Sequence, residues 1–89
     1  MIRLEAVLIG KVQRVSMRYH CKLTAEKLNL TGVVWNDSDE KRVHLIAEGP
    51  KEKLQTLLLE IKNYEYGAIN KIEEKWSKPT GEFIGFNIK

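Results

Sequence analysis

Apolar and polar residues alternate at the start of the chain. Residues 2–9 read IRLEAVLI, in which every second residue from Ile2 to Leu8 is apolar. Because successive side chains of a strand point to opposite sides, this spacing predicts a strand with one wholly apolar face. Val7 and Ile9 are apolar as well, so the far end of this strand is predicted to lie inside a sheet. Gly10 is expected to end it.

Two later segments have the three- and four-residue spacing of amphipathic helices. In residues 17–29, MRYHCKLTAEKLN, the apolar stripe consists of Met17, Cys21, Ala25 and Leu28. In residues 51–63, KEKLQTLLLEIKN, it consists of Leu54, Leu57, Leu58 and Ile61. Pro50 suits the first turn of the second helix, where its missing amide hydrogen would have no partner.

The remaining segments predict strands and turns. LTGVVWN at 30–36 and RVHLIAE at 42–48 are rich in β-branched residues and are expected to form a hairpin around the polar turn DSDEK. INKIEEKW at 69–76 alternates less clearly, and FIGFNIK at 83–89 is expected to close the chain with a short strand. Gly67, in the connector YEYGA, is the expected left-handed residue between the second helix and the following strand.

The resulting order is βαββαβ with a terminal strand, in a single domain spanning residues 1–89. Two helices with one apolar stripe each can both cover the same face of a mostly antiparallel sheet. The predicted fold class is therefore α+β, a ferredoxin-like two-layer α/β sandwich. The other face of the sheet is expected to be more exposed to solvent.

Composition and charge limit the kinds of partner and location that are expected, but they do not identify a ligand. Hydrophobic residues make up 43% and charged residues 30%, with a formal net charge of +3. This mild excess favours anionic partners but is too small for a dense nucleic-acid footprint. Cys21 is the only cysteine, and neither a membrane span nor a leader peptide is evident. A cytoplasmic monomer is the expectation.

The stretch GKVQRVSMR, residues 10–18, joins the first strand to the first helix. A tight loop that enters a helix directs several unpaired N–H groups one way, and such a concavity attracts anions. Arg18 could bind a phosphate there with its planar guanidinium, and Gly10 would allow close approach of the backbone. Val12 and Val15 could anchor the loop in the core. Geometry alone leaves an anion site and an ordinary strand-to-helix junction equally open.

GKVQRVSMR resembles the acylphosphatase signature GxVQGVxFR. In that family the first helix is followed by a segment like GxVxNxxDGxV, and this chain has GVVWNDSDEKRVHLIAEG at residues 32–49. The separation of the matched arginine and asparagine also fits, and the similarity extends over nearly the whole chain. Two linked motifs at the right separation identify the family far more strongly than either motif would.

The resemblance implies hydrolysis of the carboxyl–phosphate bond of small acyl phosphates to carboxylate and inorganic phosphate, without metal or cofactor. Arg18 matches the phosphate-binding arginine of the family, and Asn36 matches the asparagine that holds the attacking water. The cradle amides would come from Gln13, Arg14, Val15, Ser16 and Met17. Neither histidine is expected to serve as a base: His20 should face away from Arg18, and His44 should lie on the less apolar sheet face. Histidine and cysteine also lack metal-ligand spacing.

The sequence departs from the family pattern at three places. Arg14 stands where a glycine is usual, which introduces strain if the backbone there needs a positive φ. Met17 replaces a phenylalanine, and Glu40 with Lys41 replaces an Asp-Gly turn. Arg14 and the net charge leave open an alternative, a non-catalytic module that binds phosphate or RNA. The aromatic pattern of RNA-binding sheets is missing, so nucleic acid is not an expected partner.

Overall fold

The computed structural model describes residues 1–89. The elements follow the predicted order, with bounds β1 (Ile2–Lys11), α1 (Met17–Lys27), β2 (Thr31–Asn36), β3 (Arg42–Gly49), α2 (Lys51–Lys62), β4 (Ala68–Ser77) and β5 (Phe86–Ile88). Pro50 lies just before α2, and its carbonyl accepts hydrogen bonds from the amides of Lys53 and Leu54. The proline therefore precedes the first turn rather than lying within it.

The five strands form one sheet in the spatial order β4-β1-β3-β2-β5. β1 pairs in antiparallel register with both β3 and β4, and β2 pairs in the same way with β3. Only β5 runs parallel to its neighbour, β2. This arrangement confirms the predicted ferredoxin-like fold and the predicted interior position of β1.

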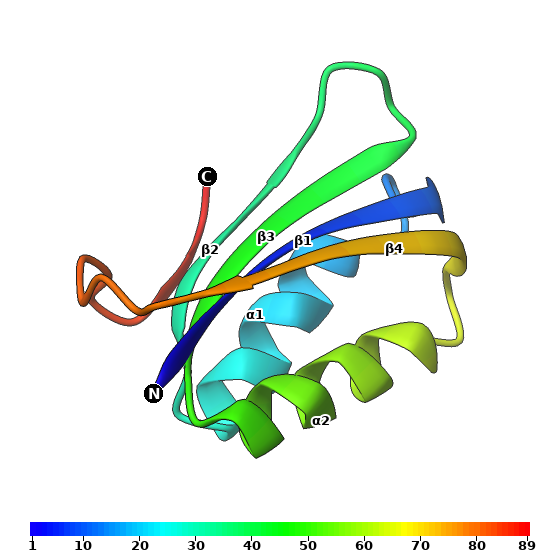
Figure 1. The fold of residues 1–89 in the computed structure, drawn as a ribbon. Coiled ribbons are helices and arrows are strands. Elements are labelled where there is room, and N and C mark those ends of the chain that lie inside the picture. The colour runs from blue at the N-terminus through cyan, green and yellow to red at the C-terminus, as the bar shows by residue number, and fades with distance from the viewer.

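Both helices cover one face of the sheet (Figure 1). The apolar faces of β1, β2 and β3 meet the helix stripes there in one core of buried side chains: Leu4, Ala6, Leu8, Val12, Met17, Cys21, Ala25, Leu30, Val34, Val43, Leu45, Ala47, Leu54, Leu57, Leu58, Ile61 and Phe86. Every predicted stripe residue of α2 is among them. The two-layer sandwich thus follows from the alternation of the strands and the spacing of the helices.

Cys21 lies on the stripe of α1 and is completely buried. Removal of its sulfur from water raises the pKa of the thiol to about 12. The thiol therefore stays protonated and acts as a small core side chain. None of the helices is long and apolar enough to cross a membrane.

Two glycines behave differently from the sequence prediction. β1 continues through Gly10, where the register with β4 shifts, and a Cβ at Gly10 would overlap the Ala68 carbonyl oxygen. Gly10 thus allows β4, and not a ligand, to approach closely. The prediction of a left-handed Gly67 is wrong, since its φ is not positive. A Cβ at Gly67 would lie 3.0 Å from the Met17 methyl carbon, so close packing explains this glycine.

The C-terminal strand is shorter than predicted because Phe83 and Ile84 lie in the loop before it. Ile84 is 92% exposed, whereas Phe86 is buried in the core. β5 follows β2 in parallel, and the amide of Lys89 donates to the carbonyl oxygen of Val34. The end of β5 is thereby held beside the end of β2.

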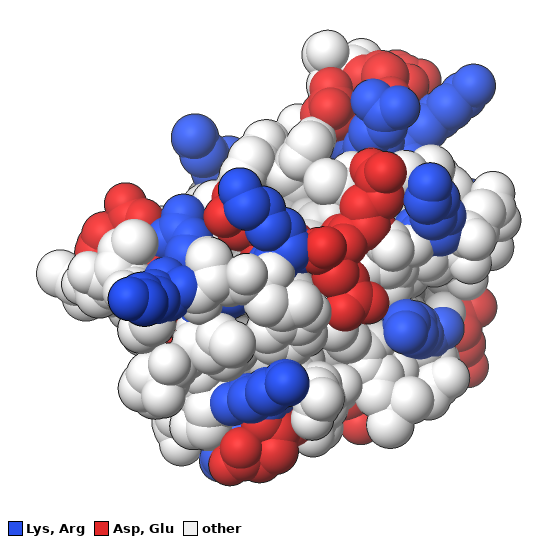
Figure 2. Space-filling model, viewed as in Figure 1, with Lys and Arg blue, Asp and Glu red and all other residues white.

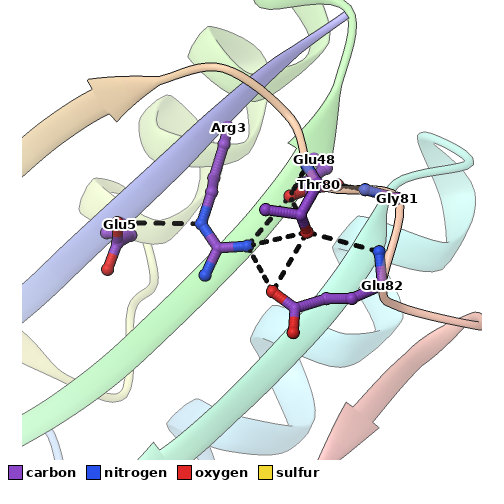
Figure 3. Close-up of polar contacts among 6 residues, drawn as sticks. All are labelled: Arg3, Glu5, Glu48, Thr80, Gly81 and Glu82. Atoms are coloured by element: carbon purple, nitrogen blue, oxygen red, sulfur yellow. Dashed lines mark hydrogen bonds and ion pairs between the residues drawn. The ribbon is translucent and has the colours of Figure 1, made fainter.

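A buried carboxylate, Glu48, fixes the loop that leads to β5 (Figure 3). The amides of Thr80 and Gly81 donate to its two oxygens at 2.8 and 2.9 Å, and the Arg3 guanidinium donates at 3.0 Å. Burial would raise the pKa of Glu48, but these donors stabilise its charged form and lower the pKa to about 2. We call these four residues the Glu48 cluster.

Candidate active site

An open pocket lies where β1 enters α1. Its walls come from the β1–α1 loop, the first turn of α1, the end of β2 and the end of β5, and they consist of Val12, Gln13, Arg14, Ser16, Met17, Arg18, Tyr19, Asn36 and Ile88. Two guanidinium groups and no carboxylate line it. The pocket thus favours an anionic ligand.

The loop backbone adopts an unusual conformation in this pocket. Arg14 and Ser16 have φ values of 62° and 59°, in the left-handed region, whereas Val15 between them does not. Such alternation turns successive N–H groups toward one point and forms a concavity for anions. No backbone amide of residues 13–19 donates a hydrogen bond within the protein. The loop and the N-terminal end of α1 therefore present a set of unpaired donors.

Arg18, in the first turn of α1, is half-buried in the same pocket. Its guanidinium takes part in no hydrogen bond or ion pair within the protein, unlike that of Arg3 or Arg14. A planar group with unused donors can bind two oxygens of a phosphate at once. The sequence-predicted arginine and the unpaired amides thus meet at one place.

Asn36, the last residue of β2, closes the pocket from the sheet side. Its Oδ1 is buried and has no hydrogen-bond partner within the protein. A buried polar atom without a partner is costly, so such atoms are rare outside functional sites. Asp37 points away from the pocket, because its carboxylate lies 2.7 Å from His44 Nε2 on the opposite face of the sheet. The hydrogen bond with His44 holds the pKa of Asp37 below its usual value.

Three other predicted residues have structural contacts that shape the loop. The side-chain amide of Gln13 donates at 2.8 Å to the carbonyl oxygens of Asp37 and Arg42, which ties the loop to the β2–β3 turn. Val15 is not a lining residue; its side chain packs against the core, and its carbonyl accepts from the Tyr64 hydroxyl at 2.7 Å. Met17 lines the pocket and is buried beneath it. These contacts hold the unpaired amides in place.

Arg14 extends from the loop toward the β2–β3 turn. Its guanidinium donates to the carboxylate of Glu40 at 2.9 Å, and both side chains are largely exposed, at 81% and 65%. Glu40 also has a positive φ, 64°. Arg14 thus has the positive φ that was identified from the sequence as a source of strain. A non-glycine residue in the left-handed region lowers the stability of the fold by roughly 1 kcal/mol. Figure 2 shows basic and acidic side chains interspersed over the visible face.

The histidines lie outside this pocket. His20 stacks on Tyr64 with ring centroids 4.1 Å apart, and His44 stacks on Trp35 at 5.2 Å on the open face of the sheet. No group of three or more histidine, cysteine, aspartate or glutamate residues is arranged to hold a metal ion. The pocket therefore contains no histidine or carboxylate, and its unpaired polar groups include backbone amides, the Arg18 guanidinium and Asn36 Oδ1.

Tyr19 and Ile88 also line the pocket, and neither was predicted from the sequence as a site residue. Ile88 reaches the pocket because β5 pairs with β2, which the local pattern of FIGFNIK does not reveal. Tyr19 is exposed on the first turn of α1, next to Arg18. Its position two residues after the start of the predicted helix was the signal that could have placed it at the mouth.

A second hollow lies on the open face of the sheet, between β1, β3 and β4. Trp35 and His44 form one wall, and Lys75 is its one basic lining residue, against Glu5, Glu73 and Glu74. Carboxylates in this number repel an anion. These two hollows thus differ in charge, and of the two the pocket at the start of α1 is the one that suits a phosphate.

Comparison with known proteins assigns the chain to a family. The family model described as Acylphosphatase matches residues 4–88. The chain is 38% identical to an acylphosphatase of Rhodococcus jostii, and the match covers 97% of each protein. The crystal structure of acylphosphatase from Bacillus subtilis is similar with a TM-score of 0.93 and 31% identity, over 100% of this chain and 99% of that one.

A second solved structure, an acylphosphatase from Coxiella burnetii, is similar with a TM-score of 0.88 and 25% identity, over 98% of this chain and 90% of that one. These comparisons confirm the resemblance drawn from the two motifs and do not favour the alternative of a non-catalytic phosphate- or RNA-binding module. The chain belongs to the acylphosphatase family of enzymes, which hydrolyse acyl phosphates.

Proposed function

We propose that the pocket at the start of α1 is the place where this enzyme hydrolyses small acyl phosphates, with Arg18 and Asn36 as its catalytic residues. The observation that carries the proposal is their meeting with the unpaired amides of residues 13–19 in a single pocket. Each of these groups is without a partner in the protein, and each matches one need of the reaction.

The phosphate group of the substrate binds in the concavity of the loop. Amides of Gln13, Arg14, Val15, Ser16 and Met17 donate to its oxygens, and the Arg18 guanidinium donates from the first turn of the helix. Because these donors are fixed before the substrate arrives, they need little reorganisation as charge redistributes in the transition state. One well-placed donor of this kind contributes on the order of 3 kcal/mol to lowering the barrier.

Asn36 holds the attacking water. Its buried Oδ1 accepts a hydrogen bond from that water and directs the water oxygen toward phosphorus. As the new P–O bond forms, the bond between phosphorus and the acyl oxygen breaks, and the carboxylate leaves with the electron pair. The proton of the water passes to a phosphate oxygen of the substrate, so the products are carboxylate and inorganic phosphate. Positioning supplies most of the catalysis.

Steady-state hydrolysis of benzoyl phosphate by the purified chain in the presence of EDTA tests this proposal. We expect turnover, with competitive inhibition by inorganic phosphate, because product and substrate share the same donors. Absence of turnover by a protein with a cooperative unfolding transition would overturn the proposal. For the role of Asn36, the Asn63→Ala variant is a matched control, because Asn63 is an exposed asparagine at the end of α2 and does not line the pocket.

We also propose that the enzyme acts as a monomer in the cytoplasm. Its exposed large apolar side chains are dispersed over several parts of the chain: Met1, Tyr19, Leu23, Leu59, Tyr66, Ile84 and Ile88. A stable dimer would need a contiguous apolar surface. The one cysteine is free and buried, which suits a reducing compartment. Light scattering coupled to size-exclusion chromatography measures the mass in solution.

A further inference from the structure

The pocket contains one more cation than the proposed phosphate site needs. Arg18 and the amides of residues 13–19 supply the donors for the phosphate, whereas Arg14 also lines the pocket and extends its guanidinium into solvent at the mouth. No carboxylate lines the pocket to neutralise Arg14; its one partner, Glu40, stands outside the lining, on the β2–β3 turn.

The ion pair between Arg14 and Glu40 does not stabilise the fold enough to explain why these two residues occupy strained positions. Both adopt the left-handed region, where glycine would avoid the strain, and their ion pair lies almost wholly in water. Exposed pairs of this kind stabilise a fold very little, so the pair does not offset the strain at two positions. A side chain held at such a cost in the wall of a pocket points to a ligand.

The geometry points to Arg14 as a specificity residue, and we propose that it favours acyl phosphates whose acyl group carries a second carboxylate. The proposal rests on the proposed function. In the free enzyme the guanidinium binds the Glu40 carboxylate, and in the complex it exchanges that partner for the carboxylate of the substrate. Such an exchange needs little free energy because both partners are carboxylates and both pairs are solvated.

Arg14 rather than Arg18 has this role because of where each arginine lies. Arg18 is half-buried and unpaired at the start of the helix, next to the unpaired amides. Arg14 is on the rim, reaches toward the β2–β3 turn and is 81% exposed. When the phosphate of a substrate is bound by the loop, its acyl group must extend toward the open side of the pocket. The guanidinium of Arg14 can contact the acyl group there.

Two matched substrates test the proposal: 4-carboxybenzoyl phosphate and its methyl ester, which differ by one charge at the far end of a rigid ring. We expect the ratio of their kcat/KM values, acid over ester, to fall about fivefold from the wild type to Arg14→Gly. Intrinsic reactivity cancels because the same two substrates are compared in each enzyme. Arg14→Lys should keep part of the preference, since its charge remains and its planar fork is lost.

Two further measurements separate a charge contact from a general change in the loop. Glu40→Gln should raise the acid-to-ester ratio, because it removes the carboxylate that competes for Arg14. Raising the salt concentration from 0.02 to about 0.5 M should lower the wild-type ratio toward that of Arg14→Gly, since exposed charges are screened. A ratio that stays within twofold in Arg14→Gly would overturn the proposal.

Binding of the non-hydrolysable 4-carboxybenzoylphosphonate and its methyl ester, measured by calorimetry, makes the test independent of turnover. A Kd ratio that depends on Arg14, in an enzyme that fails to hydrolyse benzoyl phosphate, would overturn the proposed function and support this role of Arg14. Turnover of benzoyl phosphate together with a Kd ratio that Arg14→Gly leaves unchanged would support the proposed function and overturn this role of Arg14.

Discussion

Two polar regions lie at opposite ends of the sheet and differ in how their hydrogen bonds are used. In the Glu48 cluster, the oxygens of one buried carboxylate accept from two backbone amides and one guanidinium. In the pocket at the start of α1, the amides of residues 13–19, the Arg18 guanidinium and Asn36 Oδ1 have no partner within the protein. One end supplies an internal acceptor for its donors, and the other leaves its donors open.

The difference distinguishes a structural anchor from a candidate binding site. A charge whose hydrogen bonds are complete stabilises the fold but has no capacity left for a ligand. Unpaired donors and a buried unpaired acceptor reduce stability, and a ligand that completes them recovers the loss on binding. Substitutions at the two ends should therefore separate activity from stability.

The largest effect is expected for Arg18→Ala. Under the proposed function, this substitution removes a charged donor to the phosphate, and we expect kcat/KM for benzoyl phosphate to fall about 10³-fold, with a higher KM and a lower kcat. The free energy of unfolding should hardly change, because this side chain has no partner in the free protein. Lys27→Ala removes a cation from the last turn of the same helix and is the control, with kinetics expected to match the wild type.

Asn36→Ala is expected to lower kcat about 10²-fold and to leave KM nearly unchanged. Under the proposed mechanism, the amide that positions the water is lost, while every donor to the phosphate remains. Unfolding in urea should show no loss of stability, since the substitution removes a buried oxygen without a partner. A variant with near wild-type kcat would show that another group holds the water.

Glu48→Gln should have the opposite profile, with stability reduced by about 2–3 kcal/mol and kcat within twofold of the wild type. The pH dependence follows from the pKa of Glu48, which is about 2 in the folded protein and 4.5 ordinarily. Because the folded pKa is the lower one, the stabilisation is complete above about pH 5 and is lost as the pH falls toward 2. Urea unfolding at pH 7, 4 and 2.5 should show the two proteins converging in acid.

Arg14→Gly should have a small and positive effect on stability, an increase of roughly 0.5–1 kcal/mol in the free energy of unfolding. Glycine relieves the left-handed strain, and the ion pair to Glu40 that it removes is exposed. Thermal unfolding measures the change, with Arg42→Gly as a control in β3, where glycine replaces an extended residue and should lower the melting temperature. A less stable Arg14→Gly would mean that the ion pair outweighs the strain.

The pattern of the sequence could predict most of the fold because the core is built from regular spacing. The alternation from Ile2 to Leu8 and the stripe from Leu54 to Ile61 set both which side chains are buried and which faces meet. The roles of Gly10 and Gly67 could not be predicted in this way. Each glycine is required by a close contact with an element far away in the chain, and such contacts leave no local signal.

The parts of the candidate site that lie in one stretch of sequence could be predicted. The parts that depend on contacts between residues far apart in the sequence could not. Arg18 and the loop amides lie in one continuous stretch, and Asn36 was found through the second motif. Ile88 lines the pocket through the pairing of β5 with β2, and Arg14 meets Glu40 across 26 positions of sequence. The glycine that the family motif has at the position of Arg14 predicts strain if the backbone there has a positive φ. The folded structure shows that φ is positive at Arg14.

Because Cys21 is buried, its reaction with a thiol reagent can be used to measure how often the core opens. The protonated thiol, fully enclosed between α1 and the sheet, reacts with an alkylating reagent only in molecules whose core is transiently open. Under conditions where closing outpaces alkylation, the observed rate is proportional to the open fraction. A single unengineered cysteine thus allows the free energy of opening to be measured without denaturant, in the enzyme and in each of its variants.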